Sequence, residues 1–297
     1  MFFHKLKREL FRIQAQLFYP KELRKKYVDE KIKKQEELLY EKEKRKHVFG
    51  VSYSVFDGLE LLEQSIKSIR QEVDYVNLVW QDISWNGRPS SEDVGAFVQK
   101  MKNKGLADEI IKFTPDISLK AARNEEIKRN IGLEAAKKIG CDYFMTMDCD
   151  EFYMQNEMRE AKRFILKHNI THSYCCFVCY GLKPTIRLVE PSNYAVHFFC
   201  KINEDSRLGS GFGKNENRVA VVDKSRELSD FYGAKYYFLQ NVKMHHMSFV
   251  RRSFSEKFYC SSCQDLKYVD GKTIEKIKQS LSNALSVDVP NVFDIHI

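Results

Sequence analysis

The segment Cys141-Asp-Tyr-Phe-Met-Thr-Met-Asp148-Cys-Asp150-Glu-Phe152 decides how this chain folds. Its mainly apolar residues from Tyr143 to Met147 predict a buried strand, and two carboxylates one residue apart follow the strand directly. In a turn at the exposed carboxyl end of that strand, both carboxylates can reach one cation. Carboxylate oxygens are the ligands that Mg²⁺ and Mn²⁺ prefer, and such ions complete their shells with water and phosphate oxygens. The segment therefore predicts a divalent metal site at Asp148 and Asp150.

The sequence around this segment alternates short apolar runs with amphipathic helical patterns, which is typical of βαβ units and a largely parallel sheet. We expect strands at 48–55, 75–81, 109–113 and 143–147, and helices at 59–70, 92–102 and 119–139. The loops after Val55, Gln81 and Met147 then lie at carboxyl ends of parallel strands, where ligands bind in open α/β sheets.

Beyond residue 155 the pattern becomes mixed. We expect a helix at 157–168, strands at 173–180, 195–202 and 235–242, and a terminal helix at 273–285. The chain is thus divided into residues 1–46, 47–155 and 156–297.

Residues 1–46 read as a helical extension with a break at Pro20. Apolar side chains such as Leu6, Leu10 and Ile13 lie on one side of the first helix, and residues 21–46 carry eleven Lys or Arg against seven Asp or Glu. A basic excess confined to this extension predicts contact with an anionic membrane surface rather than with nucleic acid. Docking on the body of the protein, or on a second copy, is the alternative.

Length and composition favour one large α/β domain, because 43% of the 297 residues are hydrophobic. The first residues lack the apolar core of a signal peptide, and no run of eighteen apolar residues occurs. We therefore expect a cytoplasmic protein with reduced thiols, peripheral at the inner face of a membrane. The Cys176/Cys179 and Cys260/Cys263 pairs lie too far apart for a zinc ribbon.

Several motifs in order resemble a known family. The run Ala121-Ala-Arg123-Asn124, a helix with Gly132, then Gly140-Cys-Asp-Tyr-Phe and Met147-Asp-Cys-Asp-Glu-Phe152, is similar to the core of family-2-type glycosyltransferases. The Asp-x-Asp-Glu-Phe ending is also similar to family-92-type enzymes. This resemblance covers residues 47–155 and implies a GT-A fold, Rossmann-like and mostly parallel, with the nucleotide-sugar bound in residues 47–155 and the acceptor in residues 156–297.

Carried over to this sequence, the resemblance implies that Asp148 and Asp150 bind the metal and the donor diphosphate or its ribose, and that Arg123 and Asn124 lie near the nucleotide. Asp82 stands where such enzymes present an acidic residue to the nucleoside. The usual Asp-Asp-Gly-Ser run is here Gln81-Asp-Ile-Ser, which leaves the base identity open. Arg123 pairing with a nearby carboxylate, and Asp82 capping a turn, are the structural alternatives.

His245 and His246 follow the expected strand at 235–242 and offer a third metal ligand, by analogy with retaining GT-A enzymes that have a late His ligand. Adjacent strand residues face opposite ways, so only one of them points at the metal, and we choose His246. A buried His satisfied by backbone groups is the alternative. Arg251 and Arg252 are candidates for contact with the donor phosphates.

The catalytic base of an inverting enzyme would be a carboxylate beside the acceptor hydroxyl. Glu151, Glu204, Asp205 and Glu216 are unranked candidates, and inversion or retention stays open. The leading hypothesis is metal-dependent glycosyl transfer, with Mn²⁺ or Mg²⁺, from a nucleoside diphosphate sugar, a UDP-sugar being favoured, to a carbohydrate or glycolipid acceptor in surface polysaccharide synthesis. A sugar-phosphate nucleotidyltransferase of similar fold and a non-catalytic assembly protein are the alternatives.

Overall fold

The computed structural model describes residues 2–44, 46–189, 194–210, 220–221, 223–229, 233–253, 257 and 271–297. The chain forms two compact units, residues 1–47 and 48–297. No helix of the described residues is both long enough and apolar enough to cross a bilayer.

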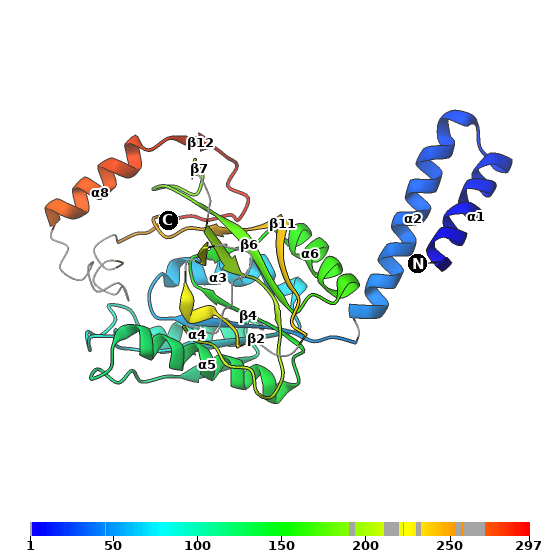
Figure 1. Ribbon diagram of the computed structural model, residues 1–297. Helices are drawn as coiled ribbons and strands as arrows, with labels where there is room; N and C mark the ends of the chain where they lie inside the picture. Colours follow the sequence, from blue (N-terminus) through cyan, green and yellow to red (C-terminus); the bar gives the residue numbers. More distant parts are fainter. Residues whose placement is uncertain are drawn as a thin grey trace. The chain divides into compact units, whose positions relative to one another are not determined.

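The first unit consists of two helices, α1 (Phe2–Phe18) and α2 (Lys21–Lys44), which lie side by side (Figure 1). The break predicted at Pro20 is observed, because proline has no N–H to continue the helical ladder. The rings of Tyr19 and Tyr27 stack at 4.2 Å across the junction. The two helices therefore hold each other through contacts close to the turn.

The second unit contains a five-stranded sheet in the order β3-β2-β1-β4-β9. Its strands are β1 (Phe49–Val55), β2 (Tyr75–Trp80), β3 (Glu109–Lys112), β4 (Tyr143–Asp148) and β9 (Cys200–Lys201). The first four are parallel, and β9 is antiparallel to β4. The predicted α/β fold with a mostly parallel central sheet and N-terminal helices is thus confirmed.

Three helices connect the parallel strands, namely α3 (Leu59–Ile69), α4 (Val94–Asn103) and α5 (Ala121–Ile139), and the short η1 (Arg70–Glu72) follows α3. Alternate residues of β1 face opposite sides, so Val51 and Tyr53 pack in the core with α3 and α4, whereas Ser52 faces α5. Gly132 of α5 lies so close that a Cβ there would collide with the Ser52 hydroxyl. This glycine lets α5 approach the sheet closely.

A second sheet has mixed strand directions and the order β10-β8-β6-β11-β5. Its strands are β5 (Glu151–Phe152), β6 (His172–Cys179), β8 (Tyr194–His197), β10 (Ala220–Val221) and β11 (Tyr236–His246). The remaining elements of this unit are α6 (Gln155–His168), which packs on β11, η2 (Lys224–Arg226), which packs on α5, α8 (Gly271–Asn283), and the antiparallel pair β7 (Ile186–Leu188) and β12 (Ser286–Asp288). Met145 and Met147 of β4 share a core with Val242 and Met244 of β11.

The strand predicted at 195–202 is wrong in extent, because the chain leaves one sheet and enters the other within it. Val196 pairs with Cys175 in the second sheet, whereas Cys200 pairs with Phe144 in the first. A similar change of sheet occurs at the predicted metal motif. Asp148 ends a strand of the first sheet, and Glu151, which pairs with His246, begins a strand of the second. The two carboxylates of the motif therefore stand where the two sheets meet.

Candidate functional site

Asp148 lies at the carboxyl end of β4, opposite Ser54 of β1. Thr146, two residues earlier on the strand, points to the same side, which is the side that α5 covers. Arg129 of α5 donates to the Thr146 hydroxyl at 3.0 Å, and its Nη2 lies 3.2 Å from Asp148 Oδ1. The helix that follows β3 thus places a cation directly beside the first carboxylate of the motif.

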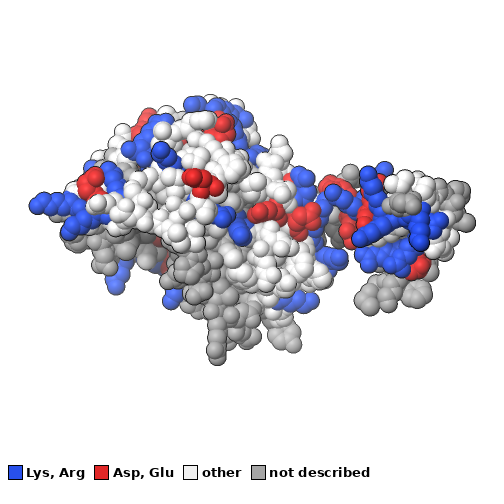
Figure 2. Space-filling model, turned by 90° about the horizontal axis from the view of Figure 1, so that it is seen from above, with Lys and Arg blue, Asp and Glu red and all other residues white. Residues whose placement is uncertain are grey.

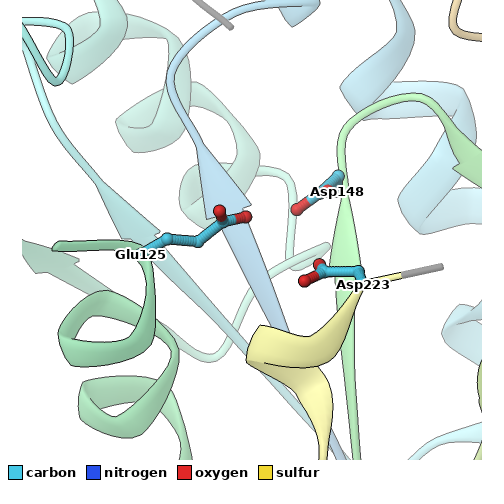
Figure 3. Close-up of side chains that lie close together, drawn as sticks. All are labelled: Glu125, Asp148 and Asp223. Carbon is cyan, nitrogen blue, oxygen red and sulfur yellow. The ribbon is translucent and has the colours of Figure 1, made fainter. Parts of the chain in front are cut away.

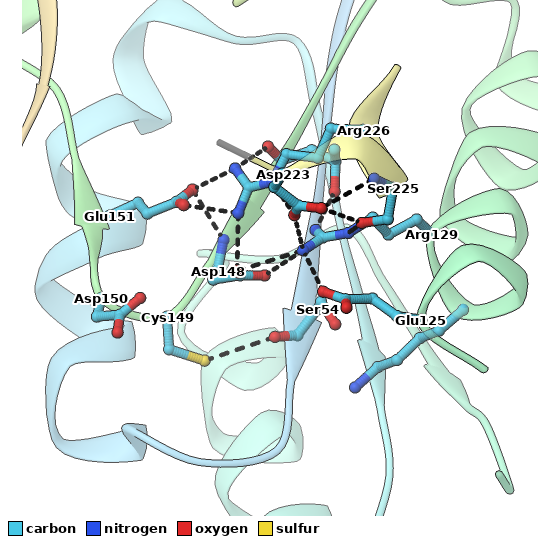
Figure 4. Close-up of polar contacts among 12 residues, drawn as sticks. Ser54, Glu125, Arg129, Asp148, Cys149, Asp150, Glu151, Asp223, Ser225 and Arg226 are labelled. Carbon is cyan, nitrogen blue, oxygen red and sulfur yellow. Dashed lines mark hydrogen bonds and ion pairs between the residues drawn. The ribbon is translucent and has the colours of Figure 1, made fainter. Parts of the chain in front are cut away.

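Two buried arginines hold Asp148 and three other carboxylates together (Figure 4). Arg129 Nη2 lies 2.8 Å from Glu125 and 2.9 Å from Asp223. Arg226 of η2 lies 2.7 Å from Asp148, 2.8 Å from Asp223 and 2.6 Å from Glu151. We call the four acidic side chains the carboxylate cluster; its members are Glu125, Asp148, Glu151 and Asp223.

The carboxylate cluster has two more acidic side chains than guanidiniums. Burial raises the pKa of Glu151 to about 7 and also raises the pKa of Glu125. Burial acts in the same direction on Asp148 and Asp223, but the nearby arginines outweigh it and lower the pKa of both. The cluster and its two arginines would carry a charge of −2 only with all four groups ionised, and protonation of Glu151 or Glu125 reduces that charge.

Three members of the cluster converge in a way that suits a divalent cation (Figure 3). Glu125, Asp148 and Asp223 each offer a carboxylate oxygen, and these oxygens lie within 4.8 Å of one another. Carboxylate oxygens are the ligand type that Mg²⁺ and Mn²⁺ prefer, and in this structure Arg129 Nη2 contacts all three side chains. Among the described residues, this is the group of three ligating side chains that the fold brings together.

Asp150 is buried and contacts a different set of cations. Its Oδ2 lies 2.5 Å from Arg251 Nη2 and 3.1 Å from Lys257 Nζ, and Arg251 also pairs with Asp57 at 3.1 Å. Burial acts to raise the pKa of Asp150, but Lys257 and Arg251 hold it well below its usual range. Asp150 therefore stays ionised. Figure 4 draws no hydrogen bond or ion pair between Asp150 and the carboxylate cluster.

The two histidines at the end of β11 face opposite ways, as alternation on a strand requires. His246 Nε2 lies 3.8 Å from Asp150 Oδ1, whereas His245 accepts or donates a 2.8 Å hydrogen bond with the Tyr180 hydroxyl. Burial lowers the pKa of both rings, that of His245 to about 4. Both imidazoles are therefore neutral near pH 7, and His246 is the one that faces the motif.

The predicted ligands Asp148, Asp150 and His246 thus do not share one site. Asp148 lies beside Arg129 and Arg226, whereas Asp150, which faces His246, lies beside Arg251 and Lys257. The 3.8 Å between Asp150 Oδ1 and His246 Nε2 is a span that two ligands of one ion can have. However, Arg251 and Lys257 sit on the other oxygen of Asp150, and their charges oppose a third cation there. Arg129 and Arg226 pair with Asp148 in the same way, so the Asp148 side is favoured as the seat of a divalent ion by the convergence of three carboxylates and not by charge.

A cavity of about 200 Å³ opens beside Asp57 at the carboxyl ends of β1 and β2. Its lining includes four basic side chains, which are Arg88, Arg251, Arg252 and Lys257, and three acidic ones, which are Asp57, Glu60 and Glu92. We call it the basic cavity. This is the sheet edge at which ligands bind in open α/β folds. The cavity is smaller than the 300–1,000 Å³ that usually encloses a whole ligand, so it suits part of one.

The three residues predicted near the nucleotide make contacts of their own outside the carboxylate cluster. Arg123 is 63% exposed and pairs with Glu126 at 3.0 Å, and the buried Asn124 exchanges hydrogen bonds with the backbone of Asp116. Asp82 is half exposed and pairs with Lys112 at 2.8 Å. Arg123 thus has the ion pair that was its structural alternative, whereas Asp82 pairs with Lys112 instead of capping a turn. Nucleotide binding by the three residues stays a prediction.

The candidates for the catalytic base fall into different places. Glu151 is buried and is held by Arg226 within the carboxylate cluster. Glu204 and Asp205 are exposed in the loop after β9, beside Lys137 near the carboxyl end of α5. They therefore lie near the amino ends of the parallel strands, whereas Asp148 lies at the carboxyl end of β4. Glu216, like Cys260 and Cys263, lies outside the described residues.

Several residues of the site were not predicted from the sequence. Glu125 and Arg129 lie on the predicted helix and form an i, i+4 pair, which was the available signal. Asp223 and Arg226 belong to a segment without a motif, and only the fold brings them to Asp148. Lys257 likewise had no sequence signal.

No protein-family model and no curated protein matches the sequence. Among solved structures, the crystal structure of S. aureus TarS 1-349 aligns with a TM-score of 0.40 and 10% identity over 80% of this chain and 71% of that chain. Structures of S. aureus TarS 1-349 in complex with UDP and with UDP-GlcNAc align with a TM-score of 0.34 and 15% identity over 44% of this chain. These two alignments span 36% and 35% of those chains, about a third of their length.

Proposed function

We propose that this protein transfers a sugar from a nucleoside diphosphate sugar to a carbohydrate or glycolipid acceptor. The observation that carries the proposal is the joint placement of the carboxylate cluster and the basic cavity at the carboxyl edge of one parallel sheet. A nucleotide-sugar needs both, because its diphosphate requires cations and its ribose and sugar hydroxyls are good donors to carboxylates. A UDP-sugar is the donor that the sequence favours.

A divalent ion, Mn²⁺ or Mg²⁺, is part of this proposal. Glu125, Asp148 and Asp223 would hold it, and when bound it would supply positive charge for the departing diphosphate. Arg129 and Arg226 orient these carboxylates through the ion pairs described above. Asp150 and His246 as further ligands stay predictions.

A thermal-shift panel of nucleoside diphosphates and their sugars, with and without MnCl₂, tests the proposal. A ligand that binds only the folded chain stabilises it by about 2.7 kcal/mol at a hundredfold excess over Kd. For a unit of this size that corresponds to a rise in Tm of about 5–11 °C. If no nucleoside diphosphate changes Tm in either condition, the donor site does not exist.

Hydrolysis of the donor then tests the role of the cluster. Replacing Asp148 by Asn should lower turnover of the best-binding nucleotide-sugar by at least about a hundredfold, the usual scale for losing one electrostatic group of an active site. Glu134→Gln is the matched control, because Glu134 lies on α5, is half exposed and, among the described residues, pairs with Lys137 and Arg207. Equal turnover by both variants would contradict the role of the cluster. Turnover of a nucleoside triphosphate with a sugar phosphate would instead indicate a nucleotidyltransferase.

We further propose that the first unit brings this activity to an anionic membrane surface at the cytoplasmic face. Residues 1–47 contain 15 basic and 8 acidic side chains, so this unit carries +7 of the net +8 of the chain. Figure 2 shows Lys and Arg over much of the visible surface of α1 and α2. Leu10 and Ile13 are 54% and 52% exposed on the same side of α1. Exposed apolar groups among basic ones are typical of helices that bind anionic bilayers.

A further inference from the structure

Arg251 is a buried cation whose hydrogen-bonding capacity is only partly used. Its side chain is 4% exposed, and Nη2, Nη1 and Nε contact Asp150, Asp57 and the carbonyl of Ser248. Among the described residues these contacts use three of the five guanidinium N–H groups. Lys257, which is 28% exposed, reaches the same oxygen of Asp150. The two carboxylates thus fix the positions of two cations that also line the basic cavity.

The backbone beside Arg251 is shaped to admit this guanidinium. Gly58 has a left-handed φ of 69°, and a Cβ at this position would lie 2.7 Å from Arg251 Nη1. Gly58 is also the N-cap of α3, and no side chain caps this helix. The amino end of a helix carries partial positive charge and exposes N–H groups that bind anions. The helix end and the two side-chain cations therefore act on the same cavity.

The charges around Asp150 balance before any ligand binds. Asp57 and Asp150 offset Arg251 and Lys257, so a divalent cation gains little there and meets two positive groups. The lining adds Arg88 and Arg252 against Glu60 and Glu92, so an anionic group would be held there by the remaining N–H groups of Arg251 and Lys257 and not by a net positive charge. A diphosphate has several oxygens for this purpose, and the cavity suits part of a larger ligand.

We propose that Asp150 acts as the anchor of Arg251 and Lys257, and that these two side chains bind the diphosphate of the donor without a divalent metal ion. This inference rests on the proposed function and specifies how the donor is held. Asp150 is then a positioning residue, a role that replaces the metal-ligand role predicted for it from the sequence. The divalent ion proposed at Asp148 would act on the diphosphate only as it departs in the reaction.

Isothermal titration calorimetry of the full chain tests this inference, with UDP, GDP, ADP and CDP as probes, once in EDTA and once in MnCl₂. We expect the best nucleotide to bind in EDTA with a Kd within about threefold of its value in MnCl₂. Lys257→Met should weaken that binding at least tenfold in EDTA, as expected for loss of one charge-assisted contact. Arg70→Met is the matched control, because Arg70 lies at the opposite end of α3 and pairs with Asp108; it should leave Kd unchanged.

The outcomes separate this inference from the proposed function. Binding that occurs only in MnCl₂, or binding in EDTA that Lys257→Met leaves unchanged, contradicts metal-free binding of the diphosphate by Arg251 and Lys257. The proposed donor site is not affected by either result. If no nucleotide binds in either buffer, both the proposed donor site and the proposed role of Arg251 and Lys257 are contradicted. The comparison of EDTA with MnCl₂ uses the unaltered chain, so it decides the question even if substitutions at Arg251 prevent folding.

Discussion

Replacing Arg129 by Met is the perturbation that tests most directly whether the carboxylate cluster is built as described. The Arg129 side chain is fully buried, and Nη2 lies within 3.2 Å of Glu125, Asp148 and Asp223. Met has a similar length and keeps most of the packing against the sheet. The change therefore removes the positive charge and leaves three carboxylates facing one another.

The expected loss of stability follows from this burial. Breaking a buried ion pair by removing one partner costs about 3–5 kcal/mol, because the remaining charge is desolvated and uncompensated. For a unit of 250 residues, each kcal/mol lowers Tm by about 2–4 °C, so the drop should be about 6–20 °C. Arg123→Met is the matched control on the same helix. Arg123 is 63% exposed and has one i, i+3 ion pair, so its loss should cost no more than about 0.5 kcal/mol.

Urea unfolding followed by circular dichroism measures both variants under the same conditions. Adding MnCl₂ should raise the stability of Arg129→Met more than that of the unaltered chain, since the cluster then lacks one of its own cations. A difference of less than about 1 kcal/mol between Arg129→Met and Arg123→Met would refute the buried cluster as the centre of the site.

Two further predictions concern the core and the first unit. His197 is buried with its pKa lowered to about 3, so between pH 6.5 and pH 3 the unfolded chain binds the proton more readily, and stability is lost as pH falls through this range. At about 1.4 kcal/mol per pKa unit the loss approaches on the order of 4 kcal/mol. We expect His197→Phe to resist acid unfolding, and urea midpoints with the same pH dependence in both proteins would contradict this. Replacing both Leu10 and Ile13 by Asp should abolish sedimentation with vesicles of anionic lipid, while neutral vesicles serve as the control. Unchanged sedimentation, or none by the unaltered chain, would end the membrane proposal, and a change of oligomeric state instead would identify a second copy as the partner.

The sequence by itself determined the order and type of most elements, because their signals are local. Alternating apolar runs predicted the four parallel strands, and β4 ends within one residue of the expected position. The break at Pro20 and the close approach at Gly132 also depend on properties of single residues. Alternation along a strand also predicted that only one of His245 and His246 faces the motif, and the structure shows that it is His246.

Only the tertiary structure decided which charges meet. Asp148 and Asp150 are neighbours in sequence, but the chain changes sheets between them, so each receives its own cations. The residues that surround Asp148 come from α5 and from η2, which lie far apart along the chain. Ion pairs between such distant segments depend on how the sheets and helices pack, and no local pattern encodes that packing.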